Sequence, residues 1–193
     1  VTNTKGLEQS RVETRAAKGY ALAFAVNPRG PDHLHTEPIA EFGSTPEAIA
    51  LIERITGDKS MATSYTTKCR AEIIRWHEDI YAITDALGLC AFSTTLAFAI
   101  NEFNLAKMYS AATGIKTDAN QLMLAGRRIL TLERLFNTRE GATRQQDDLP
   151  YRLMNEPVPS GPPKGFTNSK KELDEMLDRY YELHNWDIKT GIP

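Results

Sequence analysis

The chain has 193 residues, of which 41% are hydrophobic and 25% are charged, so its length and composition suit one sizeable globular domain with a hydrophobic core. A formal net charge of −2, with charges mixed along the chain, excludes a protein that binds nucleic acid through an extended basic surface. No apolar stretch is long enough to cross a bilayer, and the two cysteines are too few for a disulfide framework or a four-thiolate metal site, which favours a reducing, cytoplasmic compartment.

The first residues, 1–6, contain neither an initiating methionine nor the apolar core of a signal peptide, so we expect the chain to be cut from a longer one. A compact apolar run follows at 19–26, and its length is compatible with a helix or with a buried strand. The helical patterns farther along the chain favour a helix here.

Residues 27–38 predict an irregular loop, because three prolines and a glycine interrupt this stretch. The loop carries His33 and His35, and three interpretations stay open for them. Two histidines without a clear third ligand are a weak indication of a metal site. One imidazole could act as a general acid or base near neutral pH. The third interpretation is a plain polar loop.

Two helices are predicted next. Thr45 or Ser44 caps the first, Pro46 opens it and Gly57 ends it. The second and longer helix has apolar residues in steps of three and four, with most of its charged residues off that face. The apolar positions are Ile73, Trp76, Ile80, Ile83 and Leu87, and the charged ones are Glu72, Arg75, Glu78 and Asp79.

The end of this long helix is the stretch that favours a functional site. Gly88 suits the left-handed position that ends a helix, and Leu89 suits the apolar residue that packs back over the last turn. Asp85 then lies where the helix dipole disfavours a carboxylate by roughly 0.3–1 kcal/mol. A role as hydrogen-bond acceptor for a ligand would explain Asp85, and Cys90 could offer a thiolate to a metal centre. The alternative is a solvated aspartate and a buried cysteine.

Cys69 and Cys90 are predicted at opposite ends of the long helix, about 30 Å apart at 1.5 Å per residue, and therefore unpaired. Residues 91–100 carry no charge, so we expect them to be well buried. Hydroxyl groups at Ser93, Thr94 and Thr95 could donate to a sulfur-rich centre at Cys90, or to carbonyl groups of their own helix.

The remaining pattern is helical up to a proline-rich connection at 156–163. One helix at 101–113 ends at Gly114. Another begins near 117–120 and runs through Leu122, Ile129, Leu132 and Phe136 towards Gly141, with Arg127, Arg128, Glu133, Arg134 and Arg139 on its charged face. A last amphipathic helix spans 169–184, and we expect Trp186 after it to close the end of the hydrophobic core. The fold class that these elements predict is all-α and multihelical.

The series of motifs resembles the C-terminal, all-helical region of the tungsten-containing aldehyde ferredoxin oxidoreductase family. Its most specific motif is Asp85-x-x-Gly88-Leu89-Cys90. Further segments with this resemblance, in the same order, are 5–8, 13–15, 19–26, 29–30 with His33, 132–137, 148–150, 156–157 with Pro159, 161–162, 164–165, 175–177 and 180–181. The resemblance implies that residues 1–193 are one C-terminal helical domain and that an N-terminal pterin-binding part is absent.

The resemblance also implies cofactors and a reaction. Members of this family hold tungsten, or molybdenum in some cases, between two pterin dithiolenes beside a 4Fe-4S cluster. They oxidise aldehydes to carboxylic acids and pass electrons to ferredoxin or to an electron-transfer subunit. A homo-oligomer is compatible with this picture.

By the same resemblance, Asp85 corresponds to a pterin-binding aspartate, and Gly88 and Leu89 form the turn that approaches the cofactor. Cys90 corresponds to the fourth cluster ligand, and the other three ligands come from a Cys-x-x-Cys-x-x-x-Cys run that this chain lacks. His33 corresponds to a histidine near the metal, which makes it the candidate catalytic residue. The chain alone is therefore expected to bind neither cluster nor tungsten stably.

One departure concerns the substrate. Members that act on simple aldehydes tend to carry Lys or Arg two residues after the active-site histidine, where this chain has His35. A branch of the family that reduces aromatic acyl-CoA thioesters of the benzoyl-CoA type is therefore the alternative. A helical interaction domain without redox chemistry is the alternative from a different class.

Overall fold

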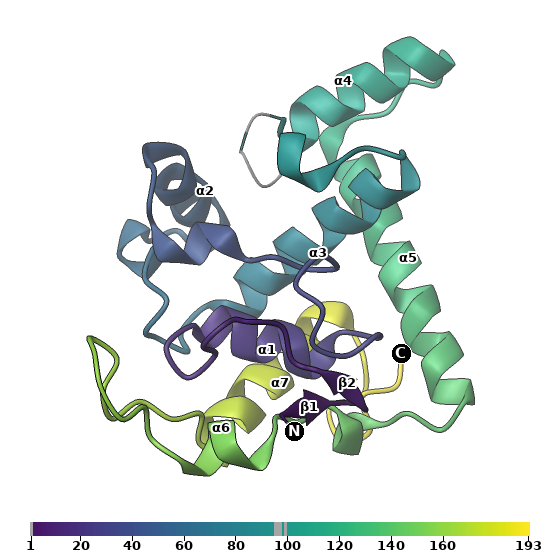
Figure 1. The fold of residues 1–193 in the computed structure, drawn as a ribbon. Coiled ribbons are helices and arrows are strands. Elements are labelled where there is room, and N and C mark those ends of the chain that lie inside the picture. The colour runs from purple at the N-terminus through teal and green to yellow at the C-terminus, as the bar shows by residue number, and fades with distance from the viewer. Residues whose placement is uncertain (1, 95–97, 99) are drawn as a thin grey trace.

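The fold is known from a computed structural model that describes residues 2–94, 98 and 100–193 (Figure 1). The α-helices are α1 (Lys18–Val26), α2 (Pro46–Thr56), α3 (Arg70–Ala86), α4 (Glu102–Thr113), α5 (Ala119–Arg139), α6 (Tyr151–Asn155) and α7 (Lys170–His184). The short 3-10 helices among the described residues are η1 (Ile39–Phe42), η2 (Lys59–Met61), η3 (Ala91–Ser93) and η4 (Arg144–Gln146). The all-α prediction is confirmed, and the small antiparallel hairpin of β1 (Asn3–Thr4) and β2 (Leu7–Glu8) was not foreseen.

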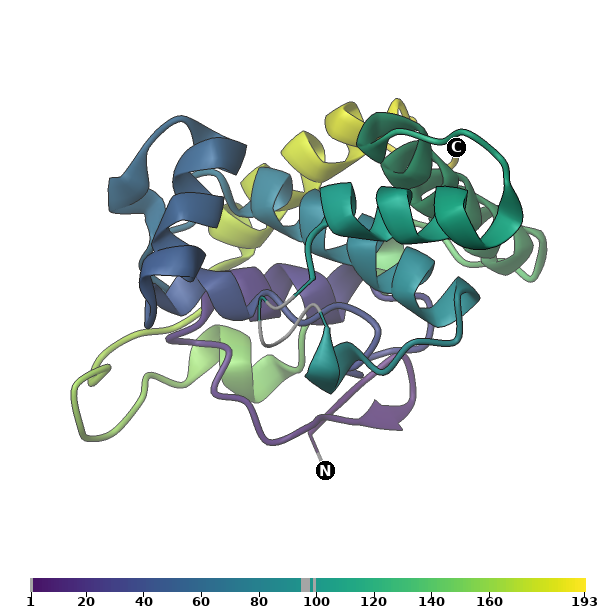
Figure 2. The ribbon, with the colours of Figure 1, turned by 90° about the horizontal axis from the view of Figure 1, so that it is seen from above.

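The long helix α3 crosses the middle of the molecule and packs against α1, α2, α5 and α7 (Figure 1). Viewed from above, α4 lies on the outside of the molecule against α5 (Figure 2). No helix among the described residues is long and apolar enough to span a membrane.

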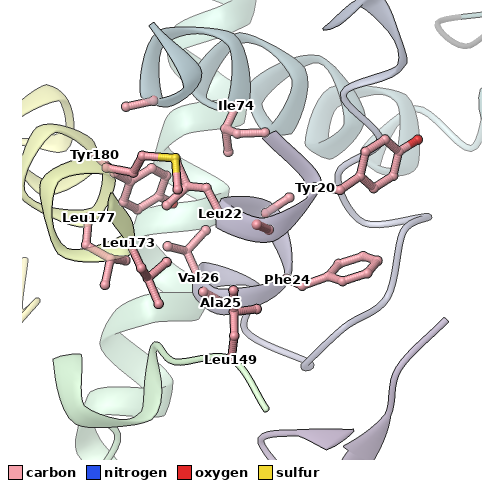
Figure 3. Close-up of a cluster of buried hydrophobic side chains, with 14 of the residues drawn as sticks. Tyr20, Leu22, Phe24, Ala25, Val26, Ile74, Leu149, Leu173, Leu177 and Tyr180 are labelled. Atoms are coloured by element: carbon pink, nitrogen blue, oxygen red, sulfur yellow. The ribbon is translucent and has the colours of Figure 1, made fainter. Parts of the chain in front are cut away.

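The main hydrophobic core surrounds α1, whose nine residues are all buried. Figure 3 shows Leu22 and Val26 of α1 among Leu173 and Leu177 of α7, with Ile74 of α3 closing the cluster. The apolar run at 19–26 is therefore a helix, as predicted. Because every side of this helix is buried, its sequence lacks the alternation of polar and apolar residues that would have identified it.

Local signals set the ends of several helices as predicted. The Thr45 hydroxyl accepts a hydrogen bond from the Ala48 backbone N–H at 3.2 Å, and Gly57 follows α2 with a φ of 76°. Capping boxes begin α5 and α7 at Asp118 and Ser169. The prolines of residues 157–163 lie in a non-helical connection, also as predicted.

The predicted charged face of α5 is partly wrong, because it includes Arg134. Leu132 and Phe136 are 67% and 56% exposed, whereas Leu130 and Arg134 are buried. The buried positions repeat every four residues from Leu122, and Arg134 is accepted in the interior because Asp147 binds its guanidinium group. Similarly, Glu78 and Asp79 of α3 are buried instead of lying off the packed face.

The prediction that residues 91–100 are well buried is wrong for the beginning of this stretch. Phe92 is 60% exposed, and Ala91–Ser93 form the short 3-10 helix η3 instead of a packed α-helix. The Ser93 and Thr94 hydroxyls donate to the Cys90 carbonyl oxygen at 3.1 and 2.8 Å, which is the local hydrogen bonding left open above. Thr95 lies outside the described residues. A lack of charge alone did not place this segment in the core.

Candidate functional site

The turn after α3 has the hydrogen bonds of a Schellman motif. The Gly88 N–H donates to the Asp85 carbonyl at 3.0 Å, and the Leu89 N–H donates to the Thr84 carbonyl at 2.9 Å. Gly88 has a φ of 68°, a left-handed conformation that glycine adopts without a steric penalty. Leu89 packs against the hydrophobic cluster around Ile83. The turn thus has the predicted geometry.

Asp85 projects from the last turn of α3 as an exposed residue. Its carboxylate has no hydrogen-bond or ion-pair partner in the part of the chain that the structure describes. A carboxylate at the negative end of a helix gains nothing from the helix dipole. The side chain is therefore free to accept hydrogen bonds from a ligand or from solvent.

Cys90 is exposed and carries a free thiol, which excludes the buried cysteine considered above. The backbone N–H groups of Ser93 and Phe92 lower the pKa of the Cys90 thiol below its usual range. Hydrogen bonds of this kind stabilise a thiolate, which is the form that binds iron. Cys69 is also free, so the predicted absence of a disulfide is confirmed.

The loop at 27–38 is held in shape by its own polar groups. The Asn27 amide donates to the Asp32 carbonyl at 2.9 Å, and the Asp32 carboxylate binds Arg29 at 2.8 Å. The same carboxylate accepts the Leu34 backbone N–H at 2.9 Å. His33, inside this turn, is half-buried, and its ring has no hydrogen-bond partner among the described residues.

His35 differs sharply from His33. It is buried, and its Nε2 lies 3.0 Å from a carboxylate oxygen of Glu133 in α5. The two histidines therefore differ in burial and in hydrogen bonding. The described residues contain no group of three or more His, Cys, Asp or Glu side chains able to hold a metal ion. Sequence analysis missed Glu133, since nothing local connects residues separated by 98 positions.

Helix α5 links the loop and the turn. Leu122 belongs to the cluster that packs against Leu89, while Glu133 holds His35. Eleven residues are about three helical turns, so the two contacts lie on the same side of α5 and about 16 Å apart along its axis. The family resemblance predicts that His33 and the turn border one cofactor-sized cleft, and this arrangement is compatible with that prediction.

Two cavities lie beside the turn after α3 and the loop at 27–38. A cavity of about 660 Å³ lies between the end of α3 and α5, where Ala86 and Leu87 form part of its wall. A smaller groove of about 360 Å³ lies beside the loop, lined by Pro28 and Arg29 together with Leu132 and Phe136 of α5. The exposed side chains of Leu132 and Phe136 thus lie near the loop that carries His33.

Comparisons with known proteins agree with the family resemblance described above. The family model described as "Aldehyde ferredoxin oxidoreductase, domains 2 & 3" matches residues 1–193. The tungsten-containing aldehyde ferredoxin oxidoreductase of Pyrococcus furiosus is 32% identical over 190 residues, which are 98% of this chain and 29% of that protein. The enzyme of the same name from Thermococcus kodakarensis is 32% identical over 192 residues, or 99% of this chain and 29% of that protein.

A solved structure is similar as well. It is the active site complex BamBC of benzoyl coenzyme A reductase with 1,5-dienoyl-CoA, with a TM-score of 0.53 and 29% sequence identity, covering 66% of this chain and 18% of that one. The chain spans less than a third of the length of these relatives.

Proposed function

This chain belongs to the aldehyde ferredoxin oxidoreductase family, and we propose that it is the C-terminal domain of a longer tungsten–pterin, iron–sulfur oxidoreductase that converts aldehydes to carboxylic acids. The observation that carries the proposal is the turn after α3, which exposes an unpartnered carboxylate at Asp85 and a thiol of lowered pKa at Cys90. The 32% identity over nearly the whole chain to enzymes that are named tungsten-containing supports it.

The residues at the turn fit the proposed cofactors. Cys90 suits an iron ligand because its sulfur is exposed and accepts backbone N–H hydrogen bonds, which also tune cluster potentials. Asp85 suits a pterin edge because a carboxylate accepts two adjacent N–H donors together. This chain would supply one cluster ligand, and the remaining ligands would come from the part of the longer protein that precedes it.

The bound tungsten–pterin group and cluster would take up the two electrons that leave the aldehyde and deliver them to ferredoxin or to an electron-transfer subunit. Oxidation of an aldehyde with water also releases protons. The His33 imidazole, which has no partner among the described residues, would accept a proton at a ring nitrogen. The loop bonds around Asp32 would hold that ring in place.

A reductase of the benzoyl-CoA type is the second candidate, favoured by the structural similarity to BamBC. His35, which stands where simple-aldehyde members tend to have Lys or Arg, binds Glu133 and is buried, so it is not available to a substrate. Two assays of the longer protein separate the reactions: an aldehyde with an oxidised low-potential dye that accepts electrons, and an aromatic acyl-CoA thioester with the reduced dye that donates them.

The first prediction tests the cluster ligand in the longer protein. We expect Cys90→Ser to lose or weaken the 4Fe-4S cluster, because a hydroxyl is a poor ligand for iron. Iron content and the electron paramagnetic resonance spectrum of the reduced protein measure the loss. Cys69→Ser is the matched control and should leave both unchanged. An unaltered cluster in Cys90→Ser would mean that Cys90 is not a ligand of the cluster.

The second prediction concerns His33. In the longer protein, His33→Asn should leave cluster and pterin content unchanged and lower kcat by about 10²- to 10⁴-fold, which is the usual contribution of a general acid or base. His35→Asn is the comparison, because it should loosen the loop and lower thermal stability as well. If His33→Asn turned over at the normal rate with its cofactors bound, His33 would have no part in proton transfer.

A further inference from the structure

A third cavity lies away from the turn and the loop. It measures about 340 Å³ and lies between α2, α3, α4 and α5. Arginines line it from three helices, Arg54 from α2, Arg75 from α3 and Arg127 from α5, and Trp76 and Asn120 complete this part of its wall. None of the residues assigned to the proposed cofactor site lines this cavity.

The carboxylates of this cavity are already engaged. Glu102 accepts hydrogen bonds from Arg54, Asp79 accepts them from Arg127, and Glu72 binds Arg179 at 2.8 Å. Arg75 has no hydrogen bond or ion pair with any residue that the structure describes. Among the arginines of this wall, Arg75 is therefore the one without a direct carboxylate partner in the described part of the chain, and Asp79 and Glu78 act on its charge only from a distance.

Two donors at this cavity are buried without an acceptor. The Nε of Arg75 and the Nε1 of the neighbouring Trp76 are shielded from solvent, and neither has a hydrogen-bond partner in the described part of the chain. A buried donor without an acceptor destabilises the fold. Burial, together with the nearby Arg127, lowers the pKa of Arg75, so its surroundings disfavour the charge. An acceptor with negative charge would satisfy both donors and the charge.

We propose that this cavity binds the oxyanion group of a small ligand, a phosphate or a carboxylate, through Arg75 and Trp76. A guanidinium group presents two parallel N–H donors to such an oxyanion, and the indole N–H supplies a third. Arg54, which lies 5.7 Å from the centre of the Trp76 ring, holds the indole from the side of α2. A water molecule would satisfy the donors and leave the charge of Arg75 unpaired.

The experiment uses the indole N–H signals of the ¹⁵N-labelled chain in nuclear magnetic resonance spectra. The chain has two tryptophans, so Trp186 serves as an internal reference for Trp76. Inorganic phosphate and acetate are titrated separately at constant ionic strength. We expect the Trp76 signal to move saturably with one or both, while the Trp186 signal stays in place. A response to phosphate alone identifies a phosphate site, and a response to acetate extends the site to carboxylates.

Two variants separate this site from general charge effects. Arg75→Gln should weaken the affinity by about 10-fold or more, because the charged fork is lost. Arg139→Gln removes the same charge from a side chain that is 74% exposed at the end of α5, and should bind normally. The absence of a saturable shift in the folded chain, or equal affinity in the two variants, would overturn the proposal.

Discussion

Cys90 and Cys69 differ in what surrounds their sulfur atoms. Backbone N–H groups lower the pKa of the Cys90 thiol, whereas burial and Glu72 raise the pKa of Cys69. A lower pKa means that a larger fraction of Cys90 is thiolate at neutral pH. We therefore predict that iodoacetamide modifies Cys90 faster than Cys69 in the folded chain. As pH rises, the rate at Cys90 should reach its plateau at a lower pH than the rate at Cys69.

Mass spectrometry of the two cysteine-containing peptides measures both rates as a function of pH. Unfolding in urea is the control, since it should bring the two rates together. Faster modification of Cys69 in the folded chain would mean that the N–H groups of Ser93 and Phe92 do not stabilise the Cys90 thiolate.

At the scale of single residues, the sequence predicted what depends on neighbours along the chain. Gly88 and Leu89 end α3 as expected because a Schellman turn needs only a few consecutive residues. The anchoring of His35 by Glu133 could not be predicted, because the two residues meet only after α5 has packed against the loop. The roles of Asp85 and His33 come from a family resemblance and stay predictions.

At the scale of helices, starts and ends were more predictable than buried faces. Caps act within one turn, so Thr45 and Asp118 identified the starts of α2 and α5. Which side of α5 is buried depends on α3 and on the C-terminal segment. Arg134 is buried because Asp147 and the Gly191 carbonyl bind it, and apolar Leu132 faces outward.

The crossing of α3 and α5 depends on a glycine. A Cβ atom at Gly126 would collide with the Asp79 carbonyl oxygen and press against Ile83. Backbone carbonyls within a helix cannot move aside easily, so Gly126→Ala should force the helices apart. We predict that the unfolding free energy falls by about 1–3 kcal/mol, although alanine favours helices by up to about 1 kcal/mol over glycine.

Urea unfolding followed by circular dichroism measures this change. Ala125→Gly is the matched comparison, because it changes the neighbouring residue in the opposite direction without adding an atom at the crossing. If Gly126→Ala were as stable as the original chain, the close approach of the two helices would not limit the packing of α3 against α5.

At the scale of the whole molecule, buried polar groups join segments that are far apart in the sequence. Arg70 and Glu41 are both fully buried, and Glu41 also accepts the Gly19 backbone N–H at 2.8 Å. Glu78 of α3 lies 2.7 Å from His184 of α7 and accepts the Tyr180 hydroxyl. Such contacts orient α1, α3 and α7 around the core, and they are costly to break because the partner left behind is a buried charge.

His77 adds a pH dependence to this interior. Its Nδ1–H donates a hydrogen bond to the Ile73 carbonyl oxygen at 2.8 Å, while its Nε2 is buried with no partner among the described residues. Burial, with a smaller effect of Arg70, lowers the pKa of His77 to about 4. The unfolded chain, with a histidine pKa near 6.5, therefore binds more protons than the folded chain as pH falls from about 6.5 to 4. The titration of His77 alone therefore lowers the free energy of unfolding as the pH falls.

Two buried carboxylates act in the opposite direction over part of this range, since burial raises the pKa of Asp79 to about 6 and that of Glu41 to about 7. Comparison with His77→Phe isolates the histidine, because both carboxylates remain in the variant. We predict that the stability of the original chain relative to His77→Phe declines by roughly 3 kcal/mol between pH 7 and pH 4. Urea unfolding at several pH values measures this difference, and a constant difference would mean that His77 does not stay neutral in the folded state.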